Sequence, residues 1–324
     1  AVIGHLLKLA TEDKSVISLG PGEPDFLTPK PLIEYTRKIV QKGTHYSAPQ
    51  GRIELREAIC RKIRKDNKIR CEPDNVIVGC GSQQVLFSAF ASTLDVSEQV
   101  VLPNPCYLAY IPQIELINAF PVFFPLREED EWDINPDLLK RAVDKKKTKV
   151  ILINTPSNPT GNVLSKKILE EIAEIAVEND LYVFSDEAYE KLIYDKKHVY
   201  IGSLNGMEDY VLTFQTFSKS YAMCGYRVGY CIGPKKVIEA MNKITHYITL
   251  SAPSISQIVA ARALSLPEKH ITRMRDEYDR RRKFIVKRLN EIGLNTVMPY
   301  GAFYTFSNIK HLSNNSYRFA QRLL

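Results

Sequence analysis

Short apolar runs alternate with helical patterns through the middle of the chain. Seven runs rich in apolar and β-branched residues predict strands, at residues 76–78, 100–102, 122–124, 150–154, 182–185, 211–216 and 227–232. Apolar residues at helical spacing predict helices between them, at residues 83–94, 136–146, 165–178 and 235–246. Near-continuous apolar strands that alternate with helices are typical of a mainly parallel, buried sheet. We therefore predict an α/β fold, with a mainly parallel central sheet and helices on both of its faces.

The two ends of the chain follow a different pattern. Residues 1–40 are irregular and Pro-rich, whereas residues 267–289 predict one long charged helix. A strand-rich piece at residues 296–307 and a helix from residue 316 onward complete the chain. We expect a large ligand-binding domain at residues 41–277. A smaller α/β domain would then form from residues 1–40 together with residues 278–324.

Composition limits the classes of protein that fit. The chain has 324 residues, of which 44% are hydrophobic and 25% charged, as is ordinary for a soluble globular protein. No apolar stretch is long enough to span a bilayer, and the first residues lack the apolar segment of a signal peptide. We therefore expect a cytoplasmic protein without a membrane partner. Because residue 1 is Ala, we also expect the sequence to begin inside its gene product.

Basic residues account for the formal net charge of +7 and gather at residues 61–70 and 280–283. Such runs can form a nucleic-acid surface. Both runs also contain apolar residues at helical spacing, which favours two solvated helix faces instead. We therefore expect no nucleic-acid partner. A positive balance also suits an anionic cofactor and anionic substrates.

The six cysteines and six histidines indicate no metal site. The cysteines contain no CxxC pair, and the histidines contain no HxxxH pair. Most of the cysteines lie inside apolar segments, where Cys behaves as a small hydrophobic residue. We therefore expect structural thiols rather than disulfides or metal ligands.

Lys219 is the strongest candidate for chemistry. It follows a predicted strand and is flanked by Ser218 and Ser220, and Arg227 stands eight residues later. A partly apolar pocket lowers the pKa of a lysine and makes its neutral amine nucleophilic, and an Arg can grip a phosphate with two parallel hydrogen bonds. A lone Ser-Lys pair would indicate only a solvated loop. The complete segment S-K-x-x-x-M-x-G-x-R-x-G-Y, which ends at Tyr230, is far more specific.

This segment resembles the lysine signature of the class I/II (fold type I) aminotransferases that depend on pyridoxal phosphate (PLP), the aspartate aminotransferase superfamily. The resemblance extends from the GPGEPDF segment at residues 20–26 to the GAFY segment at residues 301–304. It implies that Lys219 holds PLP as a Schiff base and that Arg227 binds the cofactor phosphate. It also implies phosphate contacts from Thr216 and Ser218.

Two further motifs follow predicted strands. Asp186 and Tyr189 lie in the segment FSDEAY, and Asn158 lies in the segment NTPSNPTG. A carboxylate at the pyridine nitrogen keeps that ring protonated and makes it a better electron sink. Taken alone, Asp186 would be interpreted as a helix cap. The resemblance implies that Asp186 binds the ring nitrogen, that Tyr189 and Asn158 bind the ring hydroxyl, and that Asn158 lies near the substrate carboxylate. Thr155 departs from the family motif, which usually has Asn at that position.

The GxGxxQ segment at residues 79–84 lacks the third glycine of a dinucleotide-binding motif and better fits one phosphate at a helix N-terminus. The resemblance implies contacts from six more residues. The phosphate would be bound by Gly81, Ser82 and Gln83. Tyr107 would stack on the pyridine ring and contact the substrate, and its alternative is a core aromatic residue. Tyr46 would reach the phosphate of a neighbouring subunit, and its alternative is a buried loop tyrosine. Gly22 would approach the substrate.

The implied reaction is a ping-pong amino transfer between an L-amino acid and a 2-oxo acid in a homodimer with sites at the subunit interface. The freed Lys219 amine would remove and return the Cα proton. Related C–S lyases and aminocyclopropane-carboxylate synthases share these residues, and a PLP-fold regulatory module is a non-enzymatic alternative. The family's substrate-carboxylate Arg would lie beyond Leu324, so we expect the sequence to lack a C-terminal piece. The amino donor and the oxo acceptor stay open.

Overall fold

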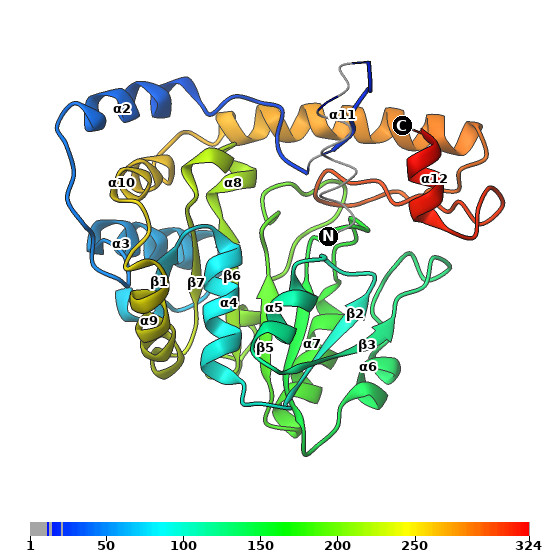
Figure 1. The fold of residues 1–324 in the computed structure, drawn as a ribbon, viewed down its shortest axis with the longest axis horizontal. Coiled ribbons are helices and arrows are strands. Elements are labelled where there is room, and N and C mark those ends of the chain that lie inside the picture. Colours follow the sequence, from blue (N-terminus) through cyan, green and yellow to red (C-terminus); the bar gives the residue numbers. More distant parts are fainter. Residues whose placement is uncertain (1–11, 13–14, 21, 324) are drawn as a thin grey trace.

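The computed structural model describes residue 12, residues 15–20 and residues 22–323, and a seven-stranded sheet lies at its centre (Figure 1). The strands are β1 (Val76–Gly79), β2 (Gln99–Asn104), β3 (Phe120–Pro125), β4 (Thr148–Asn154), β5 (Tyr182–Asp186), β6 (Val211–Thr216) and β7 (Gly229–Ile232). Their order across the sheet is β1-β7-β6-β5-β4-β2-β3. All seven predicted strands are therefore confirmed.

The sheet is mainly parallel, as predicted. Strands β2 to β6 pair in parallel with their neighbours, and only β7 runs antiparallel, to β1 on one side and to β6 on the other. The last strand begins two residues later than predicted because Arg227 adopts a left-handed conformation, with φ of 52°, that a strand excludes.

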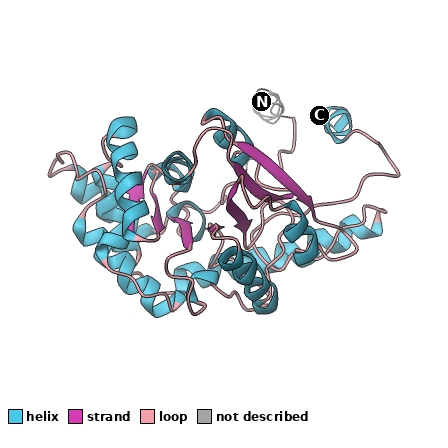
Figure 2. Cartoon of the chain, turned by 90° about the horizontal axis from the view of Figure 1, so that it is seen from below, coloured by secondary structure: helices cyan, strands magenta, loops and turns pink. Residues whose placement is uncertain are grey.

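Helices surround the sheet on both sides (Figure 2). The helices described are α2 (Lys30–Val40), α3 (Ile53–Lys62), α4 (Ser82–Thr93), α5 (Tyr110–Leu116), α6 (Pro136–Ala142), α7 (Lys166–Glu178), α8 (Phe217–Ser220), α9 (Lys235–Thr249), α10 (Ser254–Ala263), α11 (Lys269–Glu291) and α12 (Ser316–Leu323). A π-helical turn, η1 (Ile63–Asn67), continues α3, and a short 3-10 turn, η2 (Pro73–Asn75), precedes β1. The four helices predicted between the strands and the long charged helix are all present.

Three predictions about the chain ends and boundaries were wrong. Residues 30–40 form α2 rather than an irregular segment. Helix α6 ends at Ala142 because Val143 adopts an extended conformation. The piece at residues 296–307 makes only isolated bridges, Thr296 with Ser307 and Gly301 with Ile193, and Pro299 offers no N–H for a ladder.

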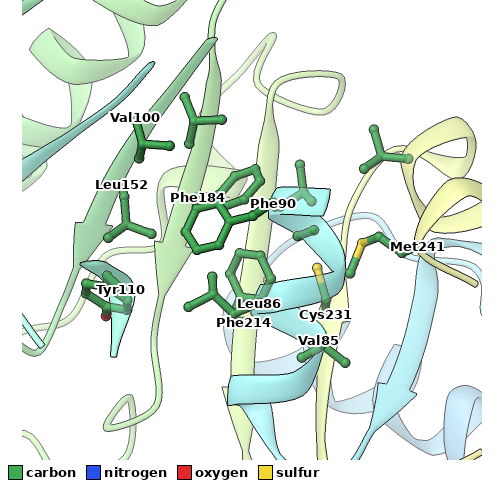
Figure 3. Packing of buried hydrophobic residues seen from close by; sticks show 14 of the residues in the cluster. Val85, Leu86, Phe90, Val100, Tyr110, Leu152, Phe184, Phe214, Cys231 and Met241 are labelled. Carbon is green, nitrogen blue, oxygen red and sulfur yellow. The ribbon is translucent and has the colours of Figure 1, made fainter. Parts of the chain in front are cut away.

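The core divides into two layers because side chains along a strand point alternately to opposite faces. From β4, Val150 and Leu152 join the cluster under α4, α5 and α9, whereas Ile151 and Ile153 join the cluster under α6 and α7. Figure 3 shows the first layer, where the rings of Phe90 and Phe184 stack 5.3 Å apart. Burying each such side chain stabilises the fold by roughly 1.5–3 kcal/mol.

The two chain ends meet over one end of the sheet. Asp25 pairs with Arg281 of α11 at 2.9 Å, and the rings of Phe26 and Tyr278 lie 5.3 Å apart. In Figure 1, α11 extends along the top of the view, at the end of the sheet where α8 also lies. None of the described helices is both long and apolar enough to cross a membrane.

The expectation that both basic runs are solvated helix faces was wrong at two positions. Lys62 is only 8% exposed and Arg282 only 5% exposed, although most of their neighbours in the two runs face solvent. Each of these cations has a partner that lies far away in the sequence: Glu190 for Lys62 and the exposed Asp195 for Arg282. Arg282 contacts Asp195 and donates to the carbonyl oxygen of Pro299 at 2.7 Å.

Candidate active site

Lys219 lies just past the carboxyl end of β6, on the short helix α8. The Thr216 side chain caps this helix by accepting a hydrogen bond from the backbone N–H of Ser218 at 3.1 Å. The Lys219 amine donates to the carbonyl oxygen of Gly22 at 2.6 Å and lies 5.8 Å and 5.7 Å from the rings of Tyr189 and Phe303. Burial lowers the pKa of Lys219, because two aromatic rings and one carbonyl oxygen replace water poorly around a cation. The site therefore favours a neutral, nucleophilic amine.

Asp186 ends the neighbouring strand β5 and is 8% exposed. Its carboxylate accepts hydrogen bonds from the Tyr110 hydroxyl at 2.6 Å and from the backbone N–H of Ala188 at 3.1 Å. Burial raises the pKa of Asp186, and these two hydrogen bonds oppose that effect. The arrangement provides an oriented acid in a nearly dry position.

Tyr110 was missed by the sequence analysis. It is the first residue of α5, three residues after Tyr107, and the two rings meet edge to face 5.3 Å apart. Its partner Asp186 stands 76 residues further along the chain, so no local pattern could reveal the bond. Tyr107 itself lies in the field of both charged groups of the site: burial and Asp186 raise the pKa of Tyr107, and Arg227 lowers it.

A second missed residue, Tyr304, closes the site from the C-terminal segment. Its hydroxyl lies 2.5 Å from the hydroxyl of Tyr189. Burial raises the pKa of Tyr304 to about 12, so the phenol stays protonated at neutral pH. A Cβ atom at Gly22 would stand 2.5 Å from the Tyr304 hydroxyl, which leaves room for no side chain at that position. Thus Gly22, Tyr189, Lys219 and Tyr304 meet in one place.

The start of α4 and Arg227 form an anion-binding arrangement. Gly81 precedes the helix with φ of +85°, and a Cβ atom there would lie 2.7 Å from the Arg227 guanidinium. Gly229 approaches the backbone nitrogen of Ser82 so closely that its Cβ would lie 2.3 Å away. The first N–H groups of a helix, including those of Ser82 and Gln83, lack partners within the helix. A cation beside these N–H groups is suited to a phosphate.

Asn158 is connected to the site through its backbone. Its N–H donates to the Asn154 side chain at 2.6 Å, and Asn154 donates to the carbonyl oxygen of Asp186 at 2.9 Å. At Thr155, the departure from the family motif, the hydroxyl accepts from the N–H of Leu164 at 3.2 Å. Asn154 therefore links two loops that both follow parallel strands.

Tyr46 is the one predicted site residue that lies apart. It is 87% exposed and makes no hydrogen bond to the other predicted residues within the described chain. The adjacent Ser47 hydroxyl contacts that of Ser254 at 2.7 Å, which places this loop against the start of α10. In residues 12, 15–20 and 22–323, no group of three or more His, Cys, Asp or Glu side chains is arranged to hold a metal ion.

Comparison with known proteins gives consistent matches over nearly the whole chain. The profile of the family "Aminotransferase class I and II" matches residues 14–324. An aspartate aminotransferase from Pyrococcus abyssi is 45% identical over 99% of this chain and 84% of its own length. An aromatic-amino-acid aminotransferase from Thermococcus litoralis is 42% identical over the same shares. The structure of a Thermus thermophilus aspartate aminotransferase with maleate has a TM-score of 0.95 at 34% identity, covering 99% of this chain and 84% of that one.

Proposed function

Because the chain belongs to the class I and II aminotransferase family, we propose that its candidate site binds pyridoxal phosphate at Lys219. The chain is an aminotransferase, an enzyme that moves an amino group between an amino acid and a 2-oxo acid. The observation that carries the cofactor proposal is the meeting of three groups at one end of the sheet. These groups are the Lys219 amine, the buried Asp186 carboxylate, and Arg227 at the start of α4.

The described residues fit each polar group of this cofactor. Its aldehyde requires an amine of lowered pKa, and burial lowers the pKa of Lys219. Its pyridine nitrogen requires a carboxylate, for which Asp186 is available. Its phosphate requires a cation and N–H donors, and Arg227 lies beside the start of α4. When bound, the cofactor supplies an electron sink for the negative charge that develops at the substrate Cα atom.

The chain's own residues then have separate tasks. Asp186, oriented by Tyr110, would hold a proton at the ring nitrogen. Burial raises the pKa of the Asp186 carboxyl, but the positive charge of a protonated ring would lower it again and favour the ionised carboxylate. Arg227, Gly81, Ser82, Gln83, Thr216 and Ser218 hold the phosphate. Lys219 would take the Cα proton of the substrate and return it, because a desolvated amine is a good base near neutral pH.

The remaining predicted residues orient the ring and the substrate. We propose that Tyr189 and Asn158 bind the ring hydroxyl and that Tyr107 stacks on the ring. Gly22, whose carbonyl oxygen accepts from Lys219, would face the substrate. Asn158 and Tyr107 would also contact the substrate.

Substrate choice is tested by a panel of donors. One similar protein is named as an aspartate aminotransferase and another as an aromatic-amino-acid aminotransferase, so both donor classes belong in the panel. No observation on the described residues favours the C–S lyase alternative. A lyase would release ammonia and pyruvate, whereas an aminotransferase makes a new amino acid.

We further propose a homodimer in which Tyr46 reaches the partner's phosphate site. In support, Tyr46 and Tyr247 are each 87% exposed, and the contact between Ser47 and Ser254 brings the Tyr46 loop near the end of α9. The division into a large domain at residues 41–277 and a small domain from both chain ends stays a prediction, supported by the pair Asp25–Arg281. The cytoplasmic location also stays a prediction.

The decisive experiment is an amino-transfer assay with L-amino acids and 2-oxo acids on the PLP-loaded protein. We expect a new amino acid from the wild type and from Lys236→Ala, an exposed lysine used as the control. Lys219→Ala should lose the visible absorption of the bound cofactor and lose turnover by about 10⁴-fold or more. Unchanged spectrum and turnover in Lys219→Ala would exclude the proposal.

A further inference from the structure

A buried polar cluster lies behind the candidate site, on the opposite face of the sheet. Its members are Lys62, Asn67, Glu187, Glu190 and Gln215, and each is at most 9% exposed. Gln215 follows Phe214, whose side chain lies in the core layer under α4 and α5, so Gln215 points to the other face. We call this group the rear cluster.

Lys62 is the centre of the rear cluster. Its three ammonium hydrogens have three acceptors: Asn67 Oδ1 at 3.0 Å, Gln215 Oε1 at 2.7 Å, and the Glu190 carboxylate. The second Glu190 oxygen accepts from Asn67 and from Gln215, each at 2.9 Å. Burial opposes the ionisation of Glu190, but the cations of Lys62 and Lys191 and the hydrogen bonds from Lys62 and Asn67 together outweigh this effect, so the pKa of Glu190 is lowered. Burial also lowers the pKa of Lys62, and the Glu190 carboxylate opposes that effect. The pair is therefore ionic and fully hydrogen-bonded.

The rear cluster connects the two segments that carry the candidate site. Glu190 directly follows Tyr189, and Gln215 directly precedes Thr216 at the end of β6. Gln215 also donates to Glu187 at 3.2 Å and accepts from the Tyr230 hydroxyl at 2.6 Å. Lys62 reaches both segments from the end of α3, so its ammonium fixes their separation.

We propose that Lys62 is a positioning residue of the aminotransferase, which sets the spacing between the Asp186–Tyr189 segment and Lys219. The proposal rests on the proposed function, because these are the residues assigned to the cofactor. Catalytic groups must be held within about 0.5 Å of their productive positions, and a displacement of about 1 Å can lower the rate by about 100-fold. Lys62 touches neither cofactor nor substrate and would act only through Glu190 and Gln215.

The test uses the double variant Lys62→Met/Glu190→Gln, which removes both charges of this pair together, so that neither partner is left as an unpaired buried ion. The control is Lys191→Met, which removes a neighbouring ion pair, with Asp66 at 2.6 Å, that solvent reaches. We expect the double variant to bind PLP about 10-fold more weakly and to lose about 10- to 100-fold in kcat/KM. The control should stay within about 3-fold of the wild type in both quantities.

A purely structural role would lower the unfolding temperature of the double variant but leave PLP affinity and kcat/KM unchanged, and that result would overturn the proposal. If the double variant does not fold, Lys62→Arg provides the same test, because a planar guanidinium cannot direct three hydrogens to these acceptors from one nitrogen. If the wild type itself binds no PLP at Lys219, the proposed function fails. If the wild type binds PLP and the variants bind it equally well, only the positioning role fails.

A separate observation concerns two cysteines in the same part of the chain. The sulfur atoms of Cys60, in α3, and Cys71, which lies before η2, are 3.0 Å apart, and both residues are at most 2% exposed. A disulfide has an S–S distance of about 2.05 Å, so a movement of about 1 Å would join them. The Cys71 thiol and the nearby arginines lower the pKa of Cys60, whereas the contact with Cys60 and burial raise the pKa of Cys71, so Cys60 is the thiol that ionises first.

We infer that Cys60 and Cys71 form an intrachain disulfide when a local opening of the fold exposes Cys60 to a small-molecule disulfide. The Cys60 thiolate attacks one sulfur of the oxidant and releases the other half as a thiol. The Cys71 thiolate then displaces the second half, so that the oxidant is reduced to two thiols and the protein loses two protons. The remaining cysteines, such as the buried Cys231, have no such partner among the described residues.

The test treats the full chain with oxidised glutathione, alkylates free thiols and maps the peptides by mass spectrometry. We expect four of the six cysteines to be alkylated and a cross-linked peptide that joins Cys60 to Cys71. Either Cys60→Ser or Cys71→Ser should abolish the cross-link, whereas Cys231→Ser should retain it. Six alkylated cysteines, or glutathione attached to Cys60 without a cross-link, would contradict the inference.

Discussion

The two faces of the sheet at the ends of β5 and β6 each hold a lysine, and the two lysines have opposite surroundings. Lys219 has one carbonyl acceptor and two aromatic rings nearby. Lys62, on the rear face, has three acceptors for its three hydrogens and a carboxylate among them. Burial lowers the pKa of both lysines, but only Lys62 has a hydrogen-bonded carboxylate, that of Glu190, to oppose this effect. The difference between a lysine available for chemistry and one held as a structural cation therefore lies in its partners.

The largest expected difference is in the free energy of unfolding when Lys62 or Lys219 is changed to methionine, an apolar residue of similar length. Lys62→Met leaves Glu190 buried without its cation, so we expect the free energy of unfolding to fall by about 3–5 kcal/mol. Lys219→Met removes an amine that has one carbonyl acceptor and no hydrogen-bonded carboxylate, so we expect a loss of only about 1 kcal/mol. Urea unfolding of the cofactor-free variants measures both. Equal losses would show that the two lysines do not differ in this way.

Asp186→Asn tests the front face next. The amide keeps the shape of the side chain but cannot hold a proton at the pyridine nitrogen as a carboxylate does. We expect kcat to fall by about 10²- to 10³-fold, as for the loss of one electrostatic contact in an active site. Steady-state kinetics on PLP-loaded protein provide the measurement. A loss of less than 10-fold would remove Asp186 from the proposed role.

Tyr110→Phe should have a smaller effect of the same kind. It deletes the hydroxyl that donates to Asp186 at 2.6 Å, and a hydrogen bond to a charged group contributes about 1.5–3 kcal/mol. We expect kcat/KM to fall by about 10- to 100-fold. Tyr107→Phe is the matched control, because it removes a neighbouring hydroxyl but keeps the ring that is proposed to stack. Equal kinetics for Tyr110→Phe and the wild type would show that Asp186 needs no such support.

The smallest expected effect is a shift in pH dependence. Because burial lowers the pKa of Lys219, its amine becomes neutral at a lower pH than that of an exposed lysine. In cofactor-free protein, acetylation of Lys219 should therefore level off at a lower pH than acetylation of the lysine in a short unstructured peptide. The same lowered pKa also affects stability. At pH values below the ordinary lysine pKa, the unfolded chain binds this proton more tightly than the folded chain does, so the free energy of unfolding is smaller. Peptide mapping after brief acetylation over a pH series measures the difference.

The sequence predicted the parts of this molecule that depend on local pattern. Apolar runs located all seven strands, and the segment around Lys219 indicated the chemistry of the site before any geometry was known. Tyr110 and Lys62 escaped because their partners, Asp186 and Glu190, stand 76 and 128 residues away. Lys62 belongs to a basic run for which we predicted a solvated helix face. Helical periodicity indicates which face of a helix is polar, but it does not indicate which residues pack against the end of that helix.

One measurement tests the central contrast most directly. PLP-loaded protein is reduced with borohydride, which fixes the cofactor covalently to the amine that holds it, and is then digested and mapped. We expect the added mass on the peptide that contains Lys219 and none on the peptide that contains Lys62. Label on Lys62, or equal label on both lysines, would contradict this expectation.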